Sequence, residues 1–127
     1  MILVDTSVWI NHLREGSQTL VGLLEQDVVV THPWVIGELA LGNITNREEV
    51  LRLLGDLPLA TLASDGELLE LIARRRLYGA GVGYVDAQLL AATKLSPETS
   101  LWTLDKRLAT LAEGLGVGFQ PHPQANH

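Results

Sequence analysis

Four acidic residues of the chain occupy positions where solvated surface charge is not expected. Asp5 directly follows a run of three apolar residues, and Asp105 follows the segment SLWT by two residues. Glu38 and Asp86 lie within the apolar segments WVIGELALG and GYVDAQLLAA. A buried carboxylate is costly unless it has a partner, so each of these acids needs a cation, a hydrogen-bond donor or water.

Each of the four acids also has an interpretation that involves no chemistry. Asp5 and Asp105 are suited to cap the helices that begin just after them. Asp86 lies near a helix start, where the helix dipole favours a negative charge. Glu38 lies within a predicted helix, where it has no backbone end to cap. These alternatives stay open for each acid alone, but the four together favour a common site.

Convergence of these acids would create a repulsion that must be relieved by proton uptake or by a divalent cation. The chain has no cysteine, and its four histidines show no ligand spacing. Hard oxygen ligands of this kind favour Mg²⁺ or Mn²⁺ over Zn²⁺. Such an ion can polarise a phosphoryl oxygen and help to generate hydroxide from water. If Asp5, Glu38, Asp86 and Asp105 converge, the pattern therefore suggests metal-dependent phosphodiester hydrolysis at the site that they form.

Helices and strands alternate along the sequence. Helices are predicted over residues 7–14, 18–26, 33–41, 47–54, 64–78, 84–95 and 106–112, and strands over 2–4, 28–31, 59–62, 100–103 and 117–119. Strands separated by helices predict an α/β fold with a mainly parallel sheet that helices cover on both faces. Since ligands gather at the carboxyl ends of parallel strands, Asp5 and Asp105 are expected at one edge of the sheet.

The composition restricts the class of protein. A chain of 127 residues, 46% hydrophobic and 19% charged, predicts one folded domain over residues 1–120 with a disordered tail over 121–127. The absence of cysteine favours the cytoplasm, and no apolar stretch approaches the roughly 18 residues of a membrane helix. A net charge of −6 argues against a protein that binds polyanions without sequence preference. It does not exclude a nuclease, because bound cations can reverse the local charge of an acidic site.

Other features are less specific. The cluster Arg74-Arg75-Arg76 suits either a phosphate backbone or a solvated helix end. The turn YGAGVG lacks the Lys and Ser or Thr of a phosphate-binding loop, so we expect a flexible hinge before the helix of Asp86. The three tryptophans, Trp9, Trp34 and Trp102, are expected in the core, and the alternative, that one of them stacks on a nucleic-acid base, is disfavoured.

The segments MILVDTSVWI, WVIGELALG, GYVDAQLLAA and LWTLDKRLA, in this order, resemble a PIN-domain ribonuclease, and more narrowly the VapC toxins of bacterial toxin–antitoxin pairs. The resemblance extends from Met1 to about Phe119. It implies a three-layer α/β/α sandwich with a central parallel sheet. It also implies one or two Mg²⁺ or Mn²⁺ ions held by the matching acids, Asp5, Glu38, Asp86 and Asp105.

The resemblance further implies an RNA substrate, a homodimer and an antitoxin protein that blocks the acidic site. Hydroxyl groups beside the acids are candidates to hold metal-bound water or phosphate, and basic residues beside Asp105 are candidates to bind substrate. These residues are Thr6, Ser7 and Thr103, and Lys106 and Arg107. One position departs from the family, since relatives often have an acid where this chain has Asn11. We expect altered hydrogen bonding there rather than loss of activity.

Two other functions are compatible with parts of the pattern. One is a PIN-like interaction module that works through its partners without turnover, which the complete set of acids disfavours. The other is a different Mg²⁺-dependent phosphohydrolase, such as a haloacid dehalogenase-like phosphatase. That chemistry requires a second aspartate two residues after the nucleophile, and here that position is Ser7.

Overall fold

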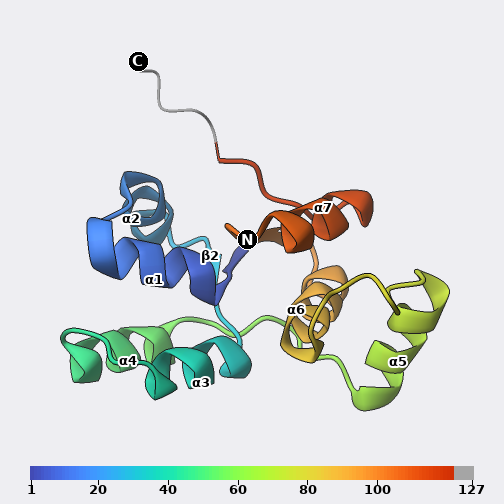
Figure 1. Ribbon diagram of the computed structural model, residues 1–127. Helices are drawn as coiled ribbons and strands as arrows, with labels where there is room; N and C mark the ends of the chain where they lie inside the picture. Colours follow the sequence, from blue (N-terminus) through green and yellow to red (C-terminus); the bar gives the residue numbers. More distant parts are fainter. Residues whose placement is uncertain (122–127) are drawn as a thin grey trace.

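A small parallel sheet forms the centre of the molecule in the computed structural model, which describes residues 1–121 (Figure 1). Its strands are β1 (Ile2–Val4), β2 (Val29–Val30) and β3 (Ser100–Trp102), in the order β2-β1-β3. In register, Leu3 pairs with Val30 on one side and with Leu101 on the other. The first strand of the chain is therefore the central strand of the sheet.

Seven helices are formed by the described residues. They are α1 (Thr6–Glu15), α2 (Gln18–Glu25), α3 (Pro33–Leu41), α4 (Arg47–Asp56), α5 (Asp65–Arg74), α6 (Tyr84–Leu95) and α7 (Lys106–Gly114). Figure 1 shows α1 and α2 on one side of the sheet and α6 and α7 on the other. The predicted three-layer α/β/α sandwich with a parallel sheet is confirmed.

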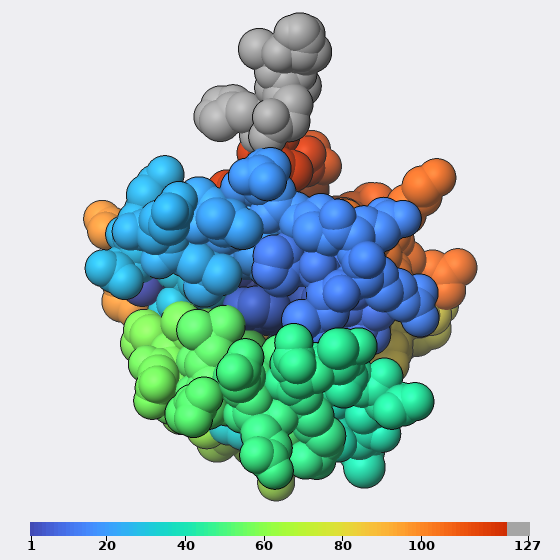
Figure 2. Space-filling view, turned by 90° about the vertical axis from the view of Figure 1, so that its left-hand side faces the viewer, coloured from blue at the N-terminus to red at the C-terminus, as the bar shows by residue number. Residues whose placement is uncertain are grey.

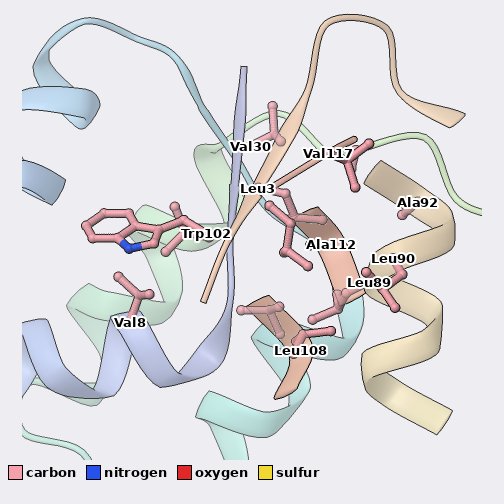
Figure 3. Close-up of a cluster of buried hydrophobic side chains, with 14 of the residues drawn as sticks. Leu3, Val8, Val30, Leu89, Leu90, Ala92, Trp102, Leu108, Ala112 and Val117 are labelled. Carbon is pink, nitrogen blue, oxygen red and sulfur yellow. The ribbon is translucent and has the colours of Figure 1, made fainter. Parts of the chain in front are cut away.

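The core fills the space on both faces of the sheet (Figure 3). Trp102 points toward Val8 of α1, whereas Leu3 points toward α6 and α7. This division follows from the strand geometry, in which successive side chains point to opposite faces. Buried leucines of α6, Leu89 and Leu90, complete the second face. The sheet is thus held between two apolar helix layers, which fixes the edge where the strands end.

Local signals explain where most helices begin. Ser64 and Glu67 form a capping box, since Ser64 Oγ accepts from the Glu67 N–H and Glu67 Oε1 accepts from the Ser64 N–H. Ser17 caps α2 in the same way through its hydroxyl. At α3 the cap is His32, whose Nδ1 accepts from the Trp34 N–H at 3.1 Å. The sequence patterns used above did not indicate a histidine cap.

Three predicted elements differ from the structure. Residues 59–62 and 117–119 are not strands, because each segment forms only one isolated parallel bridge, Leu59 with Thr31 and Gly118 with Leu101. The segments extend the two sides of the sheet by a single residue pair. Helix α5 ends at Arg74 rather than near residue 78, because Arg76 takes a positive φ of 54° that closes the helix end.

One face of the molecule joins the N-terminal helices to α4. Figure 2 shows the blue surface of α1 and α2 above the green surface of α4, and the two meet along a hollow. A groove of about 460 Å³ lies there, lined by residues of α1 and α4 that include Trp9, His12, Leu13, Val50 and Leu53. None of the four predicted site acids lines this groove.

Among the described residues, no helix combines the length and the apolar character that a membrane crossing requires. Apart from Pro121, the tail predicted to be disordered lies outside the described residues, as do His122 and His127.

Candidate acidic site at the carboxyl edge of the sheet

Asp5 lies at the end of β1 with its carboxylate held by hydroxyl groups. Its Oδ2 accepts hydrogen bonds from Ser7 Oγ and from Thr103 Oγ1, both at 2.7 Å, and a longer one of 3.4 Å from the Ser7 N–H. Each hydroxyl has a single proton, and both protons point to the same oxygen. No described residue donates to Oδ1, so this oxygen of the buried carboxylate is available to an ion.

The same two hydroxyls connect β1 to the segment that follows β3. Thr103 Oγ1 accepts from the Asp105 N–H at 3.1 Å, and Ser7 Oγ accepts from the Leu104 N–H at 3.0 Å. Parallel pairing of β1 with β3 brings these segments to one edge of the sheet, as the sequence predicted. The hydroxyls therefore fix the position of Asp5 relative to that of Asp105.

Asp105 is both an N-cap and an acid of this edge. Its Oδ1 accepts from the Leu108 N–H at 3.0 Å in the first turn of α7, and the side chain is exposed. Asp5 likewise caps α1 through its contact with the Ser7 N–H. Each aspartate uses one carboxylate oxygen for the cap and keeps the other. One aspartate side chain can thus cap a helix and still offer an oxygen to an acidic site.

Glu38 departs from the burial that its apolar neighbours suggested. The buried face of α3 is formed by Val35 and Leu39, whereas Glu38 is exposed. Its Oε1 accepts a hydrogen bond of 2.7 Å from Thr6 Oγ1 at the start of α1. The two helices are therefore joined next to Asp5, and the glutamate is oriented without being desolvated.

Asp86 lies in the first turn of α6 and is partly buried. The pKa of its carboxyl is raised to about 6. Burial is the largest cause, and the negative charges of Asp5, Asp105 and Glu38 follow in that order. A carboxylate responds in this way only to charges that lie near it. The charges of the other three predicted acids therefore all act on Asp86.

The four acids do not form a closed cage. Within residues 1–121, no group of three or more acids and histidines is arranged to hold a metal ion. Mg²⁺ fits such an open arrangement, because it keeps several of its waters and usually binds proteins through one or two carboxylates. The all-oxygen donor set and the unrelieved charge around Asp86 also suit a hard divalent cation.

A pocket of about 310 Å³ opens beside these acids. It is lined by Asp86 and Asp105, by the basic residues Lys106 and Arg107, and by Gly81, Val82 and Leu108. Arg107 Nη1 donates a hydrogen bond of 3.2 Å to the Gly81 carbonyl oxygen. Positive charge and two carboxylates therefore meet at one cavity, an arrangement that suits a phosphate group bound next to a cation.

Comparison with known proteins agrees with this architecture. The PIN-domain family model matches residues 2–114. The chain belongs to the PIN-domain family. Two Mycobacterium tuberculosis proteins named Ribonuclease VapC32, from the strains CDC 1551 / Oshkosh and ATCC 25618 / H37Rv, are each 50% identical to this PIN domain. Each alignment spans 119 residues, which is 94% of this chain and 96% of the relative. The resemblance to VapC-type proteins is confirmed.

Two further predictions concern the surroundings of the site in this PIN domain. Asn11 is partly buried on α1, one turn after Ser7 and on the same helix face, but no described residue contacts its side chain through a hydrogen bond. The expectation that all three tryptophans lie in the core is wrong for Trp34. Trp9 and Trp102 are buried, whereas 42% of Trp34 is exposed at the start of α3.

The contact between Arg107 and Gly81 was also missed by sequence reasoning. Gly81 has a φ of +77°, and a Cβ atom there would overlap the guanidinium group of Arg107. The glycines of the turn before α6 were visible in the sequence, but their partner, 26 residues away, was not. By contrast, Arg74, Arg75 and Arg76 are all exposed at the end of α5, as expected of a solvated helix end.

Proposed function

We propose that this PIN domain is a metal-dependent endoribonuclease that hydrolyses RNA phosphodiester bonds with Mg²⁺ or Mn²⁺. The observation that supports this most directly is the hydroxyl network at the edge of the parallel sheet, in which Ser7 and Thr103 donate to Asp5 and Thr103 accepts from the Asp105 N–H. The pKa of Asp86, raised by burial and by the charges of the other three acids, supports it further. The relatives named as ribonucleases support the choice of RNA as substrate.

In this proposal Asp5 and Asp86 hold the ion, and Glu38 and Asp105 contribute directly or through water. Bound there, the ion would polarise the scissile phosphoryl group and favour hydroxide as the nucleophile. The hydroxyls of Ser7 and Thr103 donate to Asp5 Oδ2, so Oδ1 would be the oxygen left to hold the ion.

The other residues of the site act on the RNA and on the attacking water. Glu38 Oε1 is held by Thr6, and no described residue donates to Oε2, which is free to accept a hydrogen bond or a proton from water. Lys106 and Arg107 line the adjacent pocket, where their charges would attract a neighbouring phosphate.

The test is RNA cleavage by the purified protein in Mg²⁺, in Mn²⁺ and in EDTA. We expect cleavage with either metal, none in EDTA, and a loss of at least about a hundredfold in Asp5→Asn, the order expected when a group that stabilises the transition state is removed. The matched control is Glu25→Gln, which removes one exposed negative charge at the end of α2 and should cleave normally. Undiminished cleavage by Asp5→Asn would exclude the proposed site.

We also propose that the protein acts in the cytoplasm as the toxin of a toxin–antitoxin pair and forms a homodimer. The support is the VapC name of its relatives and a mean hydropathy of +0.19, which suits a protein that buries surface in interfaces. Co-expression with the product of an adjacent short reading frame should give a complex that no longer cleaves RNA. Sedimentation of the free protein should give twice the mass of 13.8 kDa.

A further inference from the structure

Two exposed aromatic side chains lie together on the two helices that contain Glu38 and Asp86. Trp34 of α3 and Tyr84 of α6 are 42% and 48% exposed. Their ring centroids are 5.9 Å apart, and the planes are tilted by 58°. Single exposed apolar residues are common on protein surfaces, so exposure alone indicates nothing. The paired arrangement is different, because two partly exposed rings from separate helices lie close together.

The position of this aromatic pair connects it to the acids. Trp34 lies four residues before Glu38 on the same face of α3, so the two Cα atoms differ by about 6 Å along the helix axis. Tyr84 is the first residue of α6, and Asp86 lies in the same turn. The two helices that present the pair are thus the two helices that present Glu38 and Asp86.

The net charge of the protein indicates which kind of interaction could bind a ligand at the aromatic pair. A net charge of −6 and four clustered carboxylates give weak electrostatic attraction for a polyanion outside the metal site and the Lys106–Arg107 pocket. Stacking of a nucleobase on an aromatic ring needs no net charge and tolerates any base. Stacking on the aromatic pair could therefore supply affinity for RNA that the charge of the protein does not supply.

We propose that Trp34 and Tyr84 form a stacking platform for an unpaired nucleobase of the RNA, next to the phosphate held at the acids. The proposal rests on the ribonuclease function proposed above. The bases of a duplex are stacked on one another and cannot stack on the platform. The platform therefore favours single-stranded segments such as loops and ends. It selects RNA by strandedness rather than by sequence.

The tryptophans themselves supply a direct probe. Trp9 and Trp102 are 1% and 6% exposed, so a ligand that stacks on the surface reaches Trp34 alone. The binding arm uses the Asp5→Asn protein in Mg²⁺, which prevents cleavage under the proposed function. A short single-stranded RNA of mixed sequence should quench tryptophan fluorescence in a saturable way, and the same sequence as a blunt duplex should not. Quenching should disappear in Trp34→Phe, although that variant still binds.

The kinetic arm measures cleavage of the same single strand by proteins with intact acids. Loss of one stacking partner costs roughly a tenfold to hundredfold in binding, so Trp34→Ala and Tyr84→Ala should raise KM by about that factor with little change in kcat. Trp34→Phe and Tyr84→Phe keep a ring and should stay within about threefold of the wild type. Tyr78→Ala, at an aromatic residue that is 66% exposed and outside the pair, is the control and should be unchanged.

Three results would overturn the inference. One is unchanged KM in both alanine variants while the wild type cleaves RNA normally. Another is equal quenching by duplex and single strand. The third is dissociation of a dimer by Trp34→Ala in sedimentation, which would make the aromatic pair a contact between two copies of the chain. Absence of cleavage by the wild type, by contrast, contradicts the proposed function, and saturable quenching would then still support the platform.

Discussion

At the scale of single residues, the two aspartates that cap helices use one carboxylate oxygen for the cap and leave the other without a donor among the described residues. Asp5 and Asp105 each use one oxygen to accept from a backbone N–H at a helix start. For Asp5 the same oxygen also accepts from two hydroxyls. Capping fixes the rotamer of the side chain, and a fixed rotamer determines where the second oxygen points. Stability of the helix and orientation of the site are therefore products of one interaction.

Thr103→Val tests this coupling. The substitution keeps the shape of a buried side chain but removes the donor to Asp5 and the acceptor of the Asp105 N–H. We expect a loss of about 1–2 kcal/mol in the free energy of unfolding, because buried polar groups lose their partners. Metal affinity should fall as well, since Asp5 is no longer held. Chemical denaturation and calorimetric titration with Mn²⁺ measure the two effects.

The control for that prediction is Thr110→Val on the exposed side of α7, where the hydroxyl donates only to the Lys106 carbonyl oxygen. It should change stability by less than about 0.5 kcal/mol and leave Mn²⁺ binding intact. Equal loss in the two variants would mean that the hydroxyl network does not organise Asp5.

The charge on Asp86 should lower the stability of the metal-free protein. The pKa of Asp86 is about 6 in the folded protein against 3.8 for the unperturbed group, so the folded state takes up a proton at higher pH than the unfolded state does. Stability from this group is present at low pH and is lost as the pH rises through about 6. Asp86→Asn should therefore melt at a higher temperature than the wild type at pH 8, although it should be inactive.

The diagnostic quantity is the difference in melting temperature between Asp86→Asn and the wild type, measured in EDTA. It should shrink as the pH falls from 8 to 4. Burial lowers the pKa of His32, so the unfolded state protonates first and both proteins lose stability below about pH 6.5. That loss cancels in the difference. A difference that does not vary with pH would contradict the assignment to Asp86.

At the scale of elements, the turn before α6 is attached to the start of α7. Arg107 lies against Gly81, and Gly81 has the left-handed φ of +77° that glycine tolerates best. The contact joins the helix of Asp86 to the helix that Asp105 caps. Both residues of the contact also line the pocket that contains Asp86 and Asp105. The flexible hinge predicted from the glycines is, at this point, anchored by a side chain.

Two glycines of this turn allow a matched comparison. Gly79 and Gly81 both have positive φ, +72° and +77°, so an alanine at either position costs similar backbone strain of about 1 kcal/mol. Only at Gly81 does the new methyl group meet Arg107, whereas Gly79 has open space. Gly81→Ala should therefore lose clearly more RNA cleavage than Gly79→Ala.

The comparison is completed by the same two glycine substitutions in an Arg107→Ala background. There the methyl group at Gly81 has no guanidinium to displace, so the two glycine variants should become equal in activity. Persistence of the difference without Arg107 would show that the turn responds to something other than this contact.

The elements also show how far the sequence alone could lead. The order of helices and the parallel sheet followed from apolar runs separated by caps, and the shared edge of Asp5 and Asp105 followed from that topology. The exposure of individual side chains could not be predicted from the sequence in the same way. Glu38 and Trp34 lie in a uniformly apolar segment with little helical periodicity, so only tertiary packing decides that both face solvent. The Arg107–Gly81 contact depends on a turn conformation that no local pattern encodes.

At the scale of the whole molecule, the acids impose a cost that a cation would relieve. Repulsion among them is present only in the folded state, where the chain brings segments from both ends together. A ligand that binds the folded state alone raises its stability with concentration. Metal binding and folding are thus expected to be thermodynamically linked across the entire chain.

Thermal unfolding with increasing Mg²⁺ measures this linkage. At about a hundred times the dissociation constant, the free energy of unfolding should rise by about 2.7 kcal/mol. Asp5→Asn should lose most of the increase, whereas Glu25→Gln should retain it, since Glu25 is an exposed acid of α2. An equal rise in both variants would indicate nonspecific screening of the negative surface rather than a site.

The central position of β1 has a consequence for how the protein is made. β1 leaves the ribosome well before its neighbour β3, which begins at Ser100, and Asp105 is the last of the four predicted site acids to be made. At synthesis rates of about 5–20 residues per second, several seconds of translation separate the first acid from the last. A chain that terminates before Ser100 lacks both β3 and Asp105. The four acids can therefore come together only after the segment that contains Asp105 has been synthesised.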